Sequence, residues 1–105
     1  MKFDGAYHGN CDYSLWNKSH IGTDAVNLPS SAGIPDVIQD LVLVAPFNDL
    51  SATREIVRRH GQSLAAIIIE PVQRSYAADA EFLFGLRELC DEFDIVLVFD
   101  EIVTG

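Results

Sequence analysis

Residues 95–105 read IVLVFDEIVTG, in which five apolar residues run directly into two carboxylates, Asp100 and Glu101. A short continuous apolar run, rich in β-branched side chains, is typical of a strand covered on both faces of a parallel sheet. Two similar runs precede it, LVLVA at residues 41–45 and AAIII at residues 65–69. The sequence therefore predicts a mostly parallel, sandwiched sheet.

Two amphipathic segments separate the three runs. The first can begin at a capping residue, Asn48, and end at Gly61, with apolar residues at helical spacing between them. The second, from Glu81 to Phe93, places an apolar stripe opposite a charged face. The order strand, helix, strand, helix, strand predicts an α/β fold of three layers with right-handed crossovers.

The first forty residues differ in composition from the rest. Glycines and turn formers, including NLPSSAGIPD at residues 27–36, predict that residues 1–40 are mostly loop. A short strand is expected at residues 2–3. Residues 41–105 supply the strand and helix unit, and 105 residues suffice for one small domain.

Charge and composition exclude several classes of function. The formal net charge is −9, from 16 acidic and 7 basic residues, which disfavours binding to nucleic acid or anionic membranes. No apolar run approaches the ~18 residues of a membrane span. Cys11 and Cys90 form no metal-binding motif and fit free thiols in a reducing compartment. We therefore expect a cytoplasmic protein that binds neither membranes nor nucleic acid.

Polar residues follow each predicted strand. Glu70 follows the second run, Asp100 the third, and Asn48 and Asp49 lie just beyond the first. The carboxyl ends of parallel strands meet at one edge of a sheet, where ligands bind. A carboxylate at the end of a buried strand is costly unless it meets a cation. The protonated ring nitrogen of pyridoxal phosphate is one such cation, because a carboxylate beside it keeps the ring an electron sink.

Two other functions remain open at this point. The chain could be a standalone flavodoxin-like binding or regulatory module, in which Asp49, Asp100 and Glu101 hold Mg²⁺. It could also be a non-catalytic remnant that pairs with a homologous subunit.

Three motifs in combination resemble the class III aminotransferases, a pyridoxal phosphate family of fold type I. The motifs are KFDGAYHGN at residues 2–10, EPVQ at residues 70–73 and VFDEIVTG at residues 98–105. The resemblance is strongest to the branch that contains glutamate-1-semialdehyde 2,1-aminomutase, and it covers essentially the whole chain. It implies that residues 1–105 form an internal part of the large, cofactor-binding domain.

The resemblance implies roles for individual residues. Asp100 would pair with the pyridine nitrogen, Ile102 would pack against one face of the ring, and Tyr7 or His8 would lie over the other face. Glu70 would not contact the cofactor directly but would hold the residues that do. The implied activity is an aminotransferase or aminomutase reaction on an amino acid, amine or semialdehyde, with no metal.

The chain also departs from the family pattern. The Schiff base lysine of the family lies beyond Gly105 and its glycine-rich phosphate loop lies before Met1, so no catalytic residue is expected within the chain. Val103 stands where ornithine-type enzymes carry glutamine, and residues 73–75 (QRS) stand where aminomutases typically read Ala-Gly-Asn. We expect residues 1–105 alone to be inactive, and the full-length protein to be a homodimer.

Overall fold

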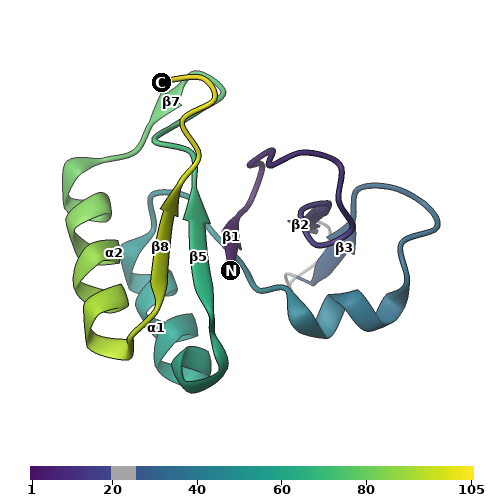
Figure 1. Ribbon diagram of the computed structural model, residues 1–105, viewed down its shortest axis with the longest axis horizontal. Coiled ribbons are helices and arrows are strands. Elements are labelled where there is room, and N and C mark those ends of the chain that lie inside the picture. Colours follow the sequence, from purple (N-terminus) through teal and green to yellow (C-terminus); the bar gives the residue numbers. More distant parts are fainter. Residues whose placement is uncertain (20–25) are drawn as a thin grey trace.

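A computed structural model describes residues 1–19 and 26–105 and confirms the α/β fold (Figure 1). No helix in these ranges is long and apolar enough to cross a bilayer. The strands are β1 (Lys2–Phe3), β2 (Trp16–Lys18), β3 (Asn27–Pro29), β4 (Val44–Ala45), β5 (Ala66–Ile69), β6 (Val72–Gln73), β7 (Tyr76–Ala77) and β8 (Val96–Phe99). The helices are the 3₁₀ helices η1 (Asp36–Leu41) and η2 (Gly61–Ser63) and the α-helices α1 (Leu50–His60) and α2 (Ala80–Phe93).

The short strand β1 lies between strands that are distant in the sequence. It pairs in parallel with β4, and the Met1 carbonyl beside it accepts the N–H of Ile68 in β5 at 3.0 Å. Strand β5 in turn pairs in parallel with β8, with Ile69 opposite Phe99. The spatial order is therefore β4, β1, β5, β8, while β2–β3 and β6–β7 form separate antiparallel pairs.

Side chains of the strands alternate between two faces. Phe3, Ile67 and Ile69 are fully buried in one cluster with residues of α1 and α2. Phe3 meets Phe82 of α2 edge to face at 5.2 Å between ring centroids. Both helices pack on this face, beside β5 and β8 (Figure 1), so the described residues supply one helical layer and the sheet. Lys2, one position before Phe3, belongs to the opposite face.

The start of α1 differs from the prediction. Asp49, not Asn48, caps the helix, because its carboxylate accepts the N–H of Ala52 at 2.9 Å. Asn48 instead adopts a left-handed backbone conformation with φ of 59°. Its side-chain amide bonds the Ala77 carbonyl at 3.1 Å and the Asp79 N–H at 3.0 Å, which ties this turn to the segment that precedes α2.

Two of the predicted strands also differ. The run at residues 41–45 contributes only Val44–Ala45, because Leu41 ends η1. Strand β8 is not covered on both faces within the described residues: Val96 is 62% exposed and Phe99 43% exposed. Its outer edge has no paired strand in these ranges, so the apolar pattern of a covered strand is here left open to solvent.

The open edge of β8 leads to a prediction about the isolated chain. Unpaired apolar edges promote association between copies, so residues 1–105 produced alone should self-associate, as measured by sedimentation velocity. Val96→Lys should reduce this association, because a charge on an edge strand opposes pairing. Val37→Lys is the matched control, since Val37 is 66% exposed but lies in η1. Unsubstituted residues 1–105 that remain monomeric and melt cooperatively, or a Val96→Lys variant that associates as strongly as Val37→Lys, would contradict the prediction.

Candidate functional site

Two carboxylates lie side by side at the carboxyl ends of β5 and β8, as predicted. Ile69 pairs with Phe99, so the residues that follow, Glu70 and Asp100, leave the sheet at the same level. The N–H of Asp100 donates to the Ile69 carbonyl at 2.8 Å and extends the pairing by one residue. The position of both acids is therefore fixed by the register of the two strands.

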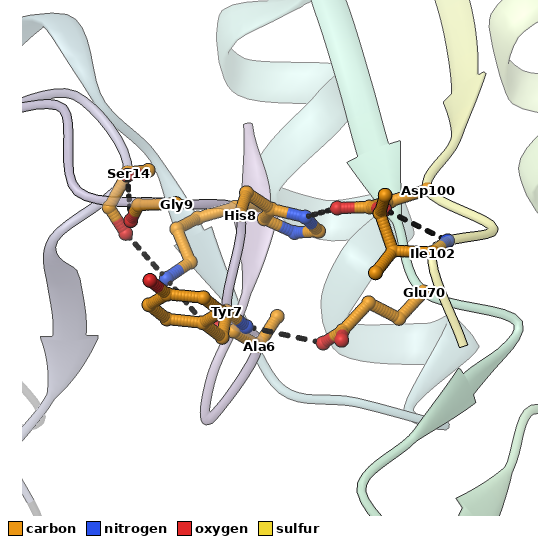
Figure 2. Close-up of polar contacts among 9 residues, drawn as sticks. Ala6, Tyr7, His8, Gly9, Ser14, Glu70, Asp100 and Ile102 are labelled. Atoms are coloured by element: carbon orange, nitrogen blue, oxygen red, sulfur yellow. Dashed lines mark hydrogen bonds and ion pairs between the residues drawn. The ribbon is translucent and has the colours of Figure 1, made fainter.

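The loop that follows β1 brings Tyr7 and His8 to these carboxylates (Figure 2). The backbone N–H of Tyr7 donates to Oε2 of Glu70 at 3.1 Å. Nδ1 of His8 lies 2.7 Å from Oδ2 of Asp100. The N-terminal loop is thus joined to two strand ends through a contact of Tyr7 with Glu70 and one of His8 with Asp100.

The contact between His8 and Asp100 is largely removed from solvent. The His8 side chain is 5% exposed and the Asp100 side chain 16% exposed. The hydrogen bond from His8 is the main cause that lowers the pKa of Asp100, and the backbone N–H of Ile102, 3.3 Å from Oδ1, acts in the same direction. Because an ionised carboxylate only accepts hydrogen bonds, Nδ1 of His8 carries the proton. Nε2 of His8 is buried and has no partner among the described residues.

Tyr7 and Ile102 have much of their surface open beside this pair. Tyr7 is 61% exposed, and its hydroxyl donates to Oδ1 of Asn10 at 2.9 Å. Ile102 is 92% exposed and follows Asp100 by two positions. The sequence left open whether Tyr7 or His8 faces a ring. The structure gives them different partners: His8 holds the carboxylate, and the ring of Tyr7 stays accessible.

The acidic residues of the alternative magnesium site are used differently. Asp49 caps α1 through Ala52, and Asp100 is bonded to His8. Within residues 1–19 and 26–105, no group of three or more His, Cys, Asp or Glu side chains could hold a metal ion. The geometry therefore does not favour the flavodoxin-like module.

Comparison with known families identifies the chain. The family model for class III aminotransferases matches residues 1–105, the whole chain. The chain belongs to the class III aminotransferase family. This confirms the resemblance drawn from the three sequence motifs.

Individual proteins and solved structures that resemble the chain agree with this assignment. The glutamate-1-semialdehyde 2,1-aminomutase of Desulfovibrio desulfuricans is 41% identical over 108 residues, which cover 100% of this chain and 25% of that protein. An omega-transaminase from Sphaerobacter thermophilus is 38% identical with a TM-score of 0.89, over 98% of this chain and 25% of that one. A transaminase structure with pyridoxal phosphate bound is 34% identical with a TM-score of 0.85, over 98% and 24% of the two chains. The chain thus spans about a quarter of the length of these relatives and has the fold type I architecture predicted for it.

Sequence reasoning missed one residue near the site. Lys2 lies in β1, is 3% exposed, and donates hydrogen bonds to the carbonyls of Ala6 and Ser14 in the loop that carries Tyr7 and His8. The available signal was a lysine next to a buried phenylalanine in a predicted strand, where charged residues are rare.

The lowered pKa of Asp100 predicts how stability depends on pH. The folded-state pKa lies below the unfolded value, which is about 3.9. The ionised carboxylate therefore stabilises the fold above about pH 4, and this contribution disappears as the pH falls through the folded pKa. Asp100→Asn should lower the thermal unfolding midpoint of the full-length protein at pH 6, measured by scanning fluorimetry. The difference from wild type should shrink as the pH is lowered below about 4, and a constant difference would contradict the assigned hydrogen bond.

Proposed function

We propose that this chain holds the pyridine ring of pyridoxal 5′-phosphate in an enzyme that transfers amino groups. The reaction is that of an aminotransferase or an aminomutase, and the substrate is a small amino acid, amine or semialdehyde. The observation that carries the proposal is Asp100, a carboxylate at the carboxyl edge of parallel strands that is held by a hydrogen bond from His8, which also lowers its pKa. When bound, the cofactor supplies the electron sink that amino-group transfer requires.

The residues at this edge fit the ring of the cofactor. Oδ2 of Asp100 is engaged by His8, whereas Oδ1 receives only the long contact from the N–H of Ile102 among the described residues. Oδ1 is therefore available to accept a hydrogen bond from a protonated ring nitrogen. The negative charge of Asp100 favours that protonated form, because opposite charges at short distance stabilise each other.

The neighbouring residues have supporting roles in this proposal. Tyr7 presents an accessible aromatic ring for stacking on one face of the cofactor, and Ile102 presents an apolar side chain for the other. Glu70 acts on the site through the backbone of Tyr7, whose N–H it binds. His8 restrains Asp100 and keeps its carboxylate turned toward the ring nitrogen.

Other parts of the reaction are assigned to groups outside these residues. The chain has two lysines: Lys2, whose ammonium is committed to two backbone carbonyls, and Lys18 in β2. Neither follows β8, where the resemblance expects the lysine that binds the cofactor. We therefore propose that a further segment of the full-length protein supplies the lysine and the phosphate-binding loop, that residues 1–105 alone are inactive, and that the full-length protein works as a cytoplasmic homodimer.

The test compares two Asp→Asn substitutions at opposite ends of β8. Asp100→Asn in the full-length protein should weaken pyridoxal phosphate binding, shift its visible absorption band, and lower amino-group transfer by about 10²-fold or more, because a preorganised charge is lost. Asp94→Asn is the matched control: Asp94 is exposed, lies before β8, and has a left-handed conformation that asparagine also adopts. An Asp100→Asn variant with the affinity and spectrum of wild type would refute the proposal.

A further inference from the structure

Lys2 is a buried lysine whose ammonium is bonded to backbone rather than to an acid. Its side chain reaches from β1 to the carbonyl oxygens of Ala6 at 2.8 Å and Ser14 at 2.7 Å. Burial lowers the pKa of Lys2, an effect partly opposed by the charges of Asp4 and Glu70. Burying an ammonium is costly, so the burial of Lys2 indicates a structural or functional role for its two carbonyl contacts.

The two carbonyls belong to the ends of the segment that carries the site residues. Ala6 directly precedes Tyr7. Ser14 closes the segment from the other side, because its hydroxyl lies 2.8 Å from the carbonyl oxygen of Gly9, the residue after His8. One ammonium therefore holds the backbone on both sides of Tyr7 and His8, and Figure 2 shows Ala6, Gly9 and Ser14 around these two residues.

The backbone of Lys2 is held by the pairing of β1 with β4. The backbone N–H of Lys2 donates to the Leu43 carbonyl at 2.9 Å, and Lys2 pairs with Val44 in the register of β1 and β4. The next residue, Phe3, is fully buried in the core beneath α1 and α2. Other contacts hold the loop at its start, such as Gln73 Nε2 to the Asp4 carbonyl at 2.7 Å. Through Ala6 and Ser14, the Lys2 side chain connects the sheet to both ends of the segment.

We propose that Lys2 is a positioning residue, whose ammonium fixes the loop from Ala6 to Ser14 so that His8 meets Asp100 and Tyr7 faces the cofactor ring. Its consequence for the reaction rests on the proposed function, but its effect on His8 does not. Without the ammonium, the carbonyls of Ala6 and Ser14 lose their donor and the loop rearranges to satisfy them. The hydrogen bond between His8 and Asp100 then lengthens or breaks.

The test uses the full-length protein with Lys2→Met, which keeps an unbranched side chain, one atom shorter than that of lysine, and removes the ammonium that donates to Ala6 and Ser14. In the apoprotein, NMR with ¹⁵N-labelled histidine should show a downfield ring N–H signal from His8 bonded to Asp100, identified by its loss in His8→Asn. This signal should be lost or shifted upfield in Lys2→Met. It should persist in Lys18→Met, the matched control, because Lys18 lies in β2.

With cofactor bound, Lys2→Met should lower kcat by up to about 10²-fold, the effect of a displacement of ~1 Å at a catalytic group, while KM changes less. An unchanged His8 signal in a folded Lys2→Met variant would overturn the inference. If Lys2→Met does not fold, Lys2→Arg carries the test: its larger head group must displace the two carbonyls, so an unshifted His8 signal would overturn the inference and a shifted one would support it.

The outcomes separate this inference from the proposed function. If Asp100→Asn retains the cofactor spectrum of wild type, the proposed function fails, while the apoprotein signal still reports on Lys2. If Asp100→Asn loses the cofactor but Lys2→Met leaves the His8 signal in place, only the role of Lys2 fails.

Discussion

The hydrogen bond between His8 and Asp100 is the constraint on which the site depends. It joins residues that are 92 positions apart in the sequence and measures 2.7 Å. Such a bond forms only if β1, which leads into the loop of His8, is brought close to β8, which ends at Asp100. The order β4, β1, β5, β8 meets this requirement with β5 as the one intervening strand. Sheet topology therefore brings His8 to Asp100, and the resulting hydrogen bond orients the carboxylate and lowers its pKa.

Strand β1 links the hydrophobic core to this site although it has only two residues. The alternation of a strand sends Phe3 to the face covered by the helices and Lys2 to the face of the loop. Burial of Phe3 holds the strand, and the strand holds the ammonium that bonds the loop. A shift of one residue in its register would exchange these two side chains, placing a charge in the core and an aromatic ring beneath the loop. Packing and site geometry therefore depend on the same register.

The sequence predicted the elements whose apolar residues repeat with a clear period or whose ends are marked by polar residues. The run at residues 65–69 and the apolar stripe of α2 identified β5 and α2 nearly to the residue, and the acids after two strands marked the site. Other features depended on tertiary structure. A strand of two residues is too short to show a hydrophobic period, so the central position of β1 in the sheet could not be predicted. Asp49 rather than Asn48 caps α1 because the Asn48 side chain is bonded to the distant residues Ala77 and Asp79. The partner of His8 was likewise fixed only by the approach of the loop to β8.

In the proposed enzyme, the described residues supply the part of the site that holds the cofactor ring. In the proposed site, Asp100 would meet the ring nitrogen, and the exposed side chains of Tyr7 and Ile102 would cover the two faces of the ring. None of these groups needs to form a covalent bond or to bind a phosphate; each acts by charge, shape and position. In this proposal, the protonation of the ring nitrogen therefore depends on contacts within residues 1–105. Because His8 is hydrogen-bonded to Asp100, any change that moves the loop relative to β8 would alter this protonation, even if the change lies far from the ring.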